Sequence, residues 1–408
     1  MRNYSENTAP AAAGSQRPLA ALLLLALLTT GGWTRAGENT PWPTAAAHNT
    51  PADAAEQTPA ATAVLDLNAF STLEQIIPVL AGKRVVFIGE QHNRFDHHLM
   101  QLEIIRRLHE QYPQLQVAIG MEAFQQPFQQ HLDDFVSGTI TEQQMLRDTE
   151  YYQRWRMDYR LYAPILRYAR EHGLPVVALN LPKELTRKVG RVGLEGLTEE
   201  ERARLPAEID RSDSAYEQRV REVFELHPND RDQAFEHFLE VQLLWDEGMA
   251  RRAADFLQTH PDHLLVVLAG AGHLAYRSAI PQRLARRVTA DYSIILNSWQ
   301  GVIEPGLADY LLLPAERTLP PAGKIGMVLD QHDDGIKVAT CFEDSPCSAA
   351  GIKPGDQLTA INTNPINTQA DVPLALWDKQ PGDTVTVSLV RKRWPFPAKT
   401  MTHEVTLK

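Results

Sequence analysis

Five short apolar runs, separated by longer amphipathic stretches, constrain the fold more than any other feature of this sequence. They lie at 84–89, 116–120, 174–180, 264–269 and 292–297, and most are rich in Val, Ile and Leu. Strands that are apolar along their whole length are buried on both faces, which is typical of a parallel sheet covered by helices. We therefore predict an α/β domain with a mostly parallel sheet flanked by helices, and a helical insertion over the charged stretch 181–260.

The remaining segments differ in composition. Arg2 and Arg17 precede an apolar run at 19–28. This run is shorter than the ~20 residues of a membrane span. Small residues before position 36 predict a secretory signal peptide over 1–36, with an uncleaved anchor as the alternative. Residues 37–63, rich in Ala, Thr and Pro, predict a flexible tether. The α/β domain is then assigned to 64–318, and short alternating strands predict a small β-rich α+β domain over 322–408.

Charge and cysteine content narrow the function classes. The chain has a formal net charge of −11. Nucleic-acid binding needs a basic face, so we expect no nucleic-acid partner, and an anionic membrane is no obvious partner either. Cys341 and Cys347 are the only cysteines, which excludes a disulfide scaffold. Export would permit a bridge between them, and a turn at Ser345-Pro346 could fold the chain back far enough to allow it. An extended chain would hold them far apart, however, so we expect two buried free thiols. No cysteine follows the N-terminal apolar run, so the expected periplasmic or otherwise exported protein is not an evident lipoprotein.

Three of the apolar runs are followed by Gly-containing segments with chemically active side chains. These segments are 89–92, 120–122 and 270–273, and they carry Glu90, His92, Glu122 and His273. The carboxyl ends of parallel strands meet at one edge of the sheet, where ligands bind in open α/β folds. His92, Glu122 and His273 could together form a two-histidine, one-carboxylate metal site. Glu90 could be a fourth ligand or a general base, and each residue alone could equally be an ordinary loop residue.

Other polar and aromatic residues flank these segments. Asn180 ends the third run and either bonds at the same edge or closes a turn. His97 and His98 begin a predicted helix, where we expect them to be solvated. An aromatic cluster at 151–162 either packs a helix on the sheet or forms the wall of a flat pocket. The sequence has no Gly-x-Ser-x-Gly elbow, Walker loop or strand-linked Gly-x-Gly-x-x-Gly, which argues against serine hydrolases, P-loop NTPases and dinucleotide oxidoreductases.

Five motifs, in order, resemble the ChaN-like haem-binding uptake family. They are Val-Val-Phe-Ile-Gly-Glu-Gln-His (85–92), Ile-Gly-Met-Glu-Ala-Phe (119–124), Asp-Tyr-Arg-Leu-Tyr-Ala-Pro-Ile-Leu (158–166), Val-Val-Ala-Leu-Asn (176–180) and Ala-Gly-Ala-Gly-His (269–273). The resemblance implies a haem-binding envelope protein concerned with haem or iron uptake. Haem ligation would fall to Tyr159, Tyr162, His92 or His273, because phenolate and imidazole both ligate haem iron.

The wider superfamily, which includes Tiki metallopeptidases and erythromycin esterases, implies an alternative. This is a metal-dependent hydrolase in which His92, Glu122 and His273 hold a divalent ion and Glu90 and Glu122 are the catalytic carboxylates. Whether the chain is an enzyme is left open at this point, and a homodimer is compatible with either interpretation.

The C-terminal segment resembles a bacterial PDZ domain. Lys324-Ile325-Gly326-Met327 matches the carboxylate-binding loop, and 345–351 with 353–356 match the Ser-Pro-Ala-Ala-Gly-Leu-x-x-Gly-Asp pattern. The resemblance implies that these four residues bind the C-terminus of a protein or peptide partner by β-augmentation. One alternative is a PDZ domain whose groove is closed and whose role is only structural. Another is that the whole chain is a catalytically inactive adaptor that works through the PDZ domain alone.

Overall fold

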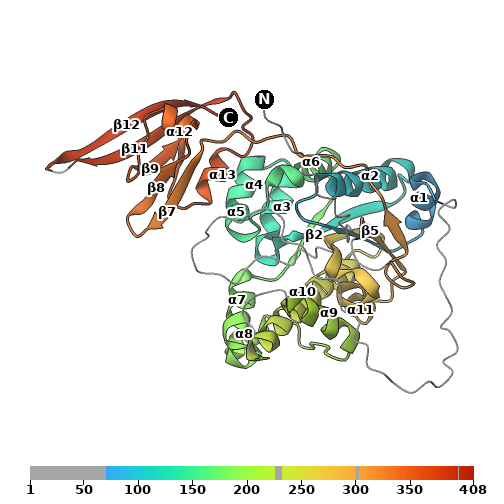
Figure 1. Ribbon diagram of the computed structural model, residues 1–408. Helices are drawn as coiled ribbons and strands as arrows, with labels where there is room; N and C mark the ends of the chain where they lie inside the picture. Colours follow the sequence, from blue (N-terminus) through green and yellow to red (C-terminus); the bar gives the residue numbers. More distant parts are fainter. Residues whose placement is uncertain (1–69, 226–231, 300–302, 394) are drawn as a thin grey trace, which may run out of the picture.

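The structure is a computed structural model that describes residues 70–225, 232–299, 303–393 and 395–408 (Figure 1). The predicted signal peptide and tether lie outside the described residues. In the described ranges, no helix combines the length and apolar character needed to cross a membrane.

A six-stranded parallel sheet forms the centre of the first domain. Its strands are β1 (Val85–Glu90), β2 (Gln116–Gln125), β3 (Val176–Asn180), β4 (His263–Gly270), β5 (Tyr292–Asn297) and β6 (Tyr310–Leu312). Their order is β3-β2-β4-β1-β5-β6, and every neighbouring pair is parallel. The predicted α/β class and all five predicted strands are confirmed. The three-residue β6 was missed because it is too short to show a pattern.

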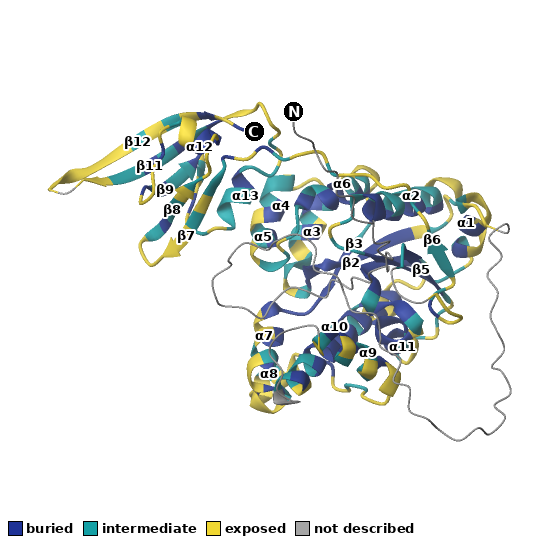
Figure 2. Ribbon diagram, viewed as in Figure 1, coloured by how far each residue is buried: buried dark blue, intermediate teal, exposed yellow. Residues whose placement is uncertain are grey.

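Helices cover both faces of this sheet, as Figure 2 shows by the burial of the strands between them. In β1, Val86 and Ile88 pack toward one layer while Val85 and Phe87 pack toward the other, as the alternation of strand side chains requires. The first layer contains α1 (Leu73–Ala81), α2 (Phe95–Gln111), α3 (Gln129–Val136), α4 (Glu142–Asp148), α5 (Tyr151–Arg154) and α6 (Ala163–His172). The second contains α10 (Asp232–Thr259) and α11 (Ala279–Ala285).

The stretch between β3 and β4 is helical, as predicted. It contains α7 (Lys183–Val192), α8 (Glu199–Ala203) and α9 (Ser214–Glu225) before α10, with the 3-10 turn η3 (Leu194–Gly196). α10 is 28 residues long and runs from this insertion onto the sheet. One helix thus links the inserted segment to the core of the domain.

The second domain is an antiparallel sheet with two short helices. Its elements are β7 (Met327–His332), β8 (Gly335–Cys341), α12 (Pro346–Ala349), β9 (Gln357–Ile361), β10 (Asn364–Pro365), α13 (Asp371–Ala375), β11 (Thr384–Arg393) and β12 (Phe396–Thr406). The strand order is β12-β11-β9-β8-β7, with β10 paired to β9. The predicted small β-rich domain is confirmed.

The two domains contact each other through α13. Leu374 belongs to the same buried cluster as the first helix layer, and its carbonyl accepts a hydrogen bond from Gln143 Nε2 at 3.4 Å. The ring of Trp377 lies 6.0 Å from that of Tyr159, edge to face. The helix that borders the second sheet is therefore also packed against the α/β domain.

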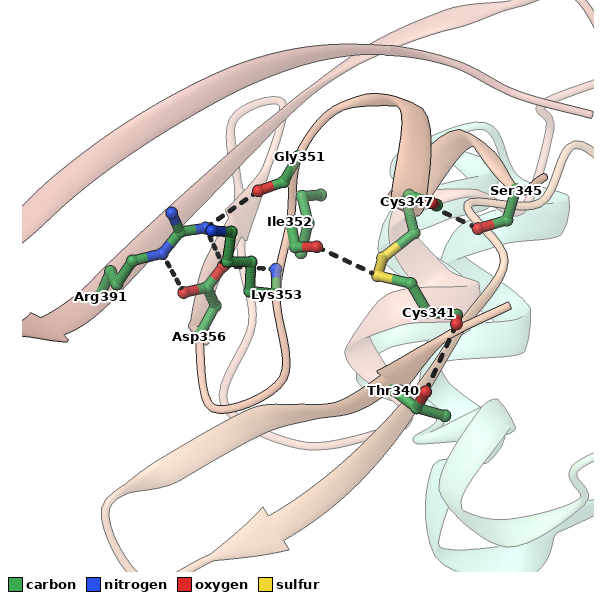
Figure 3. Close-up of a disulfide and its surroundings, with 10 residues drawn as sticks. Thr340, Cys341, Ser345, Cys347, Gly351, Ile352, Lys353, Asp356 and Arg391 are labelled. Atoms are coloured by element: carbon green, nitrogen blue, oxygen red, sulfur yellow. Dashed lines mark hydrogen bonds and ion pairs between the residues drawn. A yellow bond between two sulfur atoms is a disulfide. The ribbon is translucent and has the colours of Figure 1, made fainter. Parts of the chain in front are cut away.

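Cys341 and Cys347 form a disulfide, so the expectation of two free thiols is wrong (Figure 3). That expectation was based on the reach of an extended chain. Asp344 instead adopts a positive φ of 55°, and Ser345 caps α12 by accepting the Ser348 N–H. This turn reverses the chain and brings the two Cα atoms to 5.5 Å, inside the range that a disulfide requires.

Candidate functional site

The predicted site residues converge because β4 lies between β1 and β2. Glu90 ends β1, Glu122 lies within β2, and His273 lies in the 3-10 turn η4 (Ala271–His273) that follows β4. The N–H of Gly270, at the end of β4, donates to Glu122 Oε2 at 2.8 Å. Asn180 joins the same edge, since its Nδ2 donates to the Glu122 carbonyl at 3.1 Å. The inference that these residues share one edge of the sheet therefore holds.

Glu90 is the buried centre of one half of the site. Its Oε1 lies 2.8 Å from His92 Nδ1 and accepts a hydrogen bond from the Tyr162 hydroxyl at 3.0 Å. Its Oε2 lies 2.7 Å from His98 Nδ1, within ion-pair distance, but has no well-directed hydrogen bond. Burial raises the pKa of Glu90, but the charge of His98, together with the hydrogen bond and the charge of His92, outweighs this effect. The pKa therefore lies well below the usual range, and Glu90 is a carboxylate.

His92 is the most accessible of the four predicted residues, with 12% of its side chain exposed. With Nδ1 at Glu90, its Nε2 has no hydrogen-bond partner within the described part of the chain. The ring packs edge-on against Trp155, with 4.7 Å between centroids. It also lies over Gly270, where a Cβ would come within 3.1 Å of His92 Cε1. Glycine at this position therefore leaves room for the imidazole.

His273 is the centre of the other half. Its Nδ1 lies 2.6 Å from Asp246 Oδ1, and Asp246 Oδ2 accepts the Tyr216 hydroxyl at 2.5 Å. On the opposite side, His273 Nε2 lies 3.6 Å from Glu122 Oε1. Asp246 and His273 are both buried. The imidazole is thus held between two carboxylates that come from α10 and β2.

Both imidazoles carry raised pKa values. Burial lowers the pKa of His273, but the charges of Asp246 and Glu122 more than offset this and raise it to about 9. Burial likewise lowers the pKa of His92, and the hydrogen bond to Glu90 and the charge of Glu122 reverse the effect, so that it lies above its ordinary value. At neutral pH we therefore expect His273 to be an imidazolium.

The predicted metal site is not supported by this arrangement. Among the residues that the structure describes, no three His, Cys, Asp or Glu side chains are placed to hold one metal ion. His273 directs its two nitrogens at Asp246 and Glu122, and an imidazolium has no lone pair to offer a cation. Glu122 and His273 form an ion pair, whereas His92 is paired with Glu90.

The two tyrosines predicted as haem ligands are buried. Tyr159 donates its hydroxyl to Glu142 at 2.7 Å, and Tyr162 donates to Glu90. Burial, together with these neighbouring carboxylates, raises both phenol pKa values well above the ordinary value. Most of the aromatic cluster therefore packs helices on the sheet, and the haem-ligand role of Tyr159 and Tyr162 stays a prediction.

Two further histidines were wrongly expected to be solvated. His97 and His98 are 0% and 1% exposed, because the first turn of α2 directs them toward β1. His97 Nδ1 accepts the Gln91 N–H, and burial lowers its pKa to about 4. His98 instead contacts Glu90 and becomes part of the site.

Asp246 was not identified from the sequence. The signal that could have found it is its position on the apolar stripe of α10, at i+7 from Leu239 and i+3 from Leu243, both of which are buried. An acidic residue on a buried stripe needs a partner, and here the partner is His273.

The predicted carboxylate-binding loop of the second domain has free donors. Lys324 exchanges backbone hydrogen bonds with Lys408, and the Ile325 carbonyl accepts the Cys347 N–H. The N–H groups of Ile325 and Gly326 have no acceptor in the described ranges. Gly326 has a φ of +77°, and a Cβ there would lie 2.5 Å from Ser345 Cβ. Binding of a terminal carboxylate by Lys324, Ile325, Gly326 and Met327 stays a prediction.

Comparison with known protein families agrees with this architecture. Residues 76–284, half of the chain, match the family described as haem-binding uptake, Tiki superfamily, ChaN. The chain belongs to this family. Residues 323–407 match the PDZ domain, so this ChaN-like protein carries a C-terminal PDZ domain.

Individual relatives are distant. The solved structure of ChaN from Campylobacter jejuni, described as cofacial heme binding, has a TM-score of 0.50 at 18% identity, over 60% of this chain and 92% of that chain. It shows a shared fold. A mutant erythromycin esterase, EreC, in its open conformation has a TM-score of 0.34 at 19% identity, over 55% of this chain and 72% of that one. The Arabidopsis thaliana chloroplastic protein RETICULATA-RELATED 5 is 25% identical over 53% of this chain, which spans less than a third of that relative's length.

Proposed function

We propose that this ChaN-like protein is exported, binds haem at the carboxyl edge of its parallel sheet, and takes part in haem or iron uptake. Family membership supports haem as the ligand. The observation that carries the assignment to this edge is the state of His92. Its Nε2 has no partner in the described ranges, while its Nδ1 is anchored by Glu90. Export rests on the N-terminal sequence alone.

The residues around His92 fit a haem group. Haem needs a deprotonated imidazole nitrogen or a phenolate for its iron and a flat apolar wall for its ring. Because the pKa of His92 is raised, iron would have to displace the proton from its Nε2. The indole of Trp155 lies edge-on beside His92 and offers such a wall. Bound haem would supply a redox-active iron whose properties depend on its axial ligand. Glu90 would orient His92 and increase the basicity of Nε2 by holding the other nitrogen.

His92 is a better candidate ligand than the other three predicted residues. Both ring nitrogens of His273 face carboxylates. Tyr159 and Tyr162 would have to leave Glu142 and Glu90 and ionise inside the core, where burial disfavours the phenolate. These three remain alternatives that the following experiment separates.

The test is a haem titration followed by absorption spectroscopy. We expect His92→Ala to weaken haem binding by about tenfold or more, which is ~1.4 kcal/mol or more, because the iron would lose a protein ligand. Tyr159→Phe, Tyr162→Phe and His273→Gln should retain the wild-type spectrum. The matched control is His332→Ala, which removes an exposed histidine of the PDZ domain. If His92→Ala keeps the wild-type haem affinity and one of the other variants loses it, the residue replaced in that variant is the haem ligand. No haem spectrum in any form would refute the haem proposal.

The number of haems bound per chain bears on the oligomeric state of the protein. The Campylobacter jejuni ChaN structure is described as cofacial heme binding. Two haems face to face in this protein would need either two haems at one site or a second copy of the chain. We propose the homodimer, and haem-dependent dimerisation in sedimentation equilibrium is the expected result.

The PDZ domain is proposed to bind the C-terminus of a partner protein. β7 is the edge strand next to the carboxylate loop, and an edge strand offers unpaired backbone groups to an added peptide strand. The Leu329 carbonyl of β7 already accepts Gln369 Nε2 at 2.8 Å. A peptide strand that uses this carbonyl would have to displace Gln369.

Hydrolysis is a second candidate, favoured by the arrangement around His273. Asp246 holds Nδ1 of the imidazole and Glu122 lies beside Nε2, so that a proton can be held or released at one defined atom. Glu90 is a weak base because its carboxylate is stabilised by His92 and His98. Ester or peptide hydrolysis that survives a chelator and is lost in His273→Gln would support this function. Hydrolysis that persists in His273→Gln would exclude it.

A further inference from the structure

The end of the β11–β12 hairpin projects beyond the PDZ sheet. β9 pairs with β11 only as far as Val390, which lies opposite Gln357. Beyond this point β11 has only β12 as its neighbour, through Arg391 opposite Lys399 and Arg393 opposite Phe396. In Figure 1 this end tapers away from the α/β domain, and in Figure 2 it is exposed. The hairpin end is therefore a free surface that the fold itself does not use.

This surface is cationic in a chain that is acidic overall. From Thr384 to His403 the sequence contains no Asp or Glu, but it contains Arg391, Lys392, Arg393 and Lys399. Arg391 is committed to a two-point ion pair with Asp356, and Lys392 lies 3.2 Å from Asp334 while its side chain stays 70% exposed. Arg393 and Lys399 have no carboxylate partner in the described ranges. Their charges are available to an anionic ligand.

The same end presents apolar groups to solvent. The side chain of Phe396 is among the most exposed large apolar groups of the described chain, at 71%. It shares a concavity of about 400 Å³ with Arg393, Pro397, Ala398 and Lys399. An exposed phenylalanine alone is common on protein surfaces. An exposed phenylalanine between two unpaired cations, at the end of a projecting hairpin, is the combination that suits a water–lipid boundary.

We propose that the hairpin end formed by Arg393, Phe396 and Lys399 docks on the surface of an anionic lipid bilayer. Arg393 and Lys399 would lie among the acidic headgroups, and Phe396 would enter the boundary of the acyl chains. Each cation near such a surface contributes about a fivefold gain in binding. A duplex nucleic acid would use the same charges, but its bases are stacked inside the helix and offer no face to Phe396. The net charge of −11 hides this local patch, which is why overall composition argued against a membrane partner.

The test is flotation of the full chain with vesicles of phosphatidylcholine alone or mixed with phosphatidylglycerol. We expect binding only to the anionic vesicles. Arg393→Gln combined with Lys399→Gln should weaken it by roughly 25-fold. Phe396→Ser should weaken it by about tenfold, because the buried apolar area is lost. The matched control is Arg191→Gln with Arg202→Gln, which removes the same charge from exposed positions in the α/β domain.

Three results would overturn the proposal. Equal binding to both kinds of vesicle would remove the electrostatic argument. Wild-type binding by both hairpin variants would place membrane contact elsewhere, for example in the apolar run at 19–28, which all variants share. Tight binding to duplex DNA that the double variant loses, without vesicle binding, would make the hairpin a nucleic-acid surface. Thermal unfolding of each variant shows whether the PDZ domain remains folded.

Discussion

The ion pair between His273 and Asp246 predicts a specific dependence of stability on pH. The pKa of His273 is raised from 6.5 to about 9 in the folded protein, and it returns to its ordinary value on unfolding. A group whose pKa is raised by folding stabilises the protein fully below its unfolded value and loses this effect as the pH rises through its folded value. The stabilisation by His273 is therefore lost between about pH 6.5 and pH 9. The shift of about 2.5 pKa units corresponds to about 3 kcal/mol.

The measurement compares the wild type with His273→Gln, which cannot titrate. Free energies of unfolding in urea, followed by the helical signal, are measured at pH 6 and pH 10. We expect the advantage of the wild type over the variant to shrink by about 3 kcal/mol between these pH values. Because the result is a difference between two proteins at two pH values, the titration of groups that do not interact with His273 cancels.

Two outcomes would refute this reasoning. An advantage that stays constant would mean that His273 does not change its protonation in this window. An advantage that grows with pH would mean that the folded state favours the neutral imidazole, as a metal ligand would require. His332→Gln in the PDZ domain is the control for the removal of a histidine at an exposed position.

Two further predictions concern packing. Gly270→Ala would place a Cβ 3.1 Å from His92 Cε1, so we expect the imidazole to move. Haem affinity, measured by equilibrium titration, should then fall about tenfold. Unchanged affinity would contradict a role of His92 in haem binding. Replacing Cys341 and Cys347 with Ala should destabilise the PDZ domain by about 2 kcal/mol. It should also weaken C-terminal peptide binding, because the disulfide fixes residue 347, whose backbone N–H binds the Ile325 carbonyl. A thiol reductant should reproduce both effects in the wild type. Calorimetry and peptide titration measure them, and no change in either would contradict a stabilising role of the disulfide.

The fold class could be predicted because it depends on local patterns. Strand after strand is apolar along its length, and the intervening stretches have helical periodicity. The strand order could not be predicted, because the insertion of β4 between β1 and β2 depends on contacts between residues 180 positions apart for β1 and 147 positions apart for β2. The length of β2 was also underestimated, so that Glu122 lies inside a strand and not after it.

The candidate site was predictable to the extent that its residues follow strands. Glu90, His92 and His273 were found by that rule. Asp246 and His98 were not, because they come from helices whose rotation about their axes decides what they face. The disulfide was missed for a similar reason, since the positive φ of Asp344 reverses the chain within one turn. The apolar periodicity of a sequence does not specify the backbone conformation of single residues such as Asp344.

The central place of β4 has a consequence for the order in which the chain can fold during synthesis. β1 pairs only with β4 and β5, and both are made long after it. Until residue 263 has left the ribosome, β2 and β3 are the only strands of this sheet that can pair with each other. The apolar β1 therefore has no strand partner while the whole helical insertion is translated. Unpaired apolar strands are prone to aggregate. A shortened chain that stops before β4 would therefore lack both the centre of the sheet and His273, so the candidate site cannot assemble before the domain is complete.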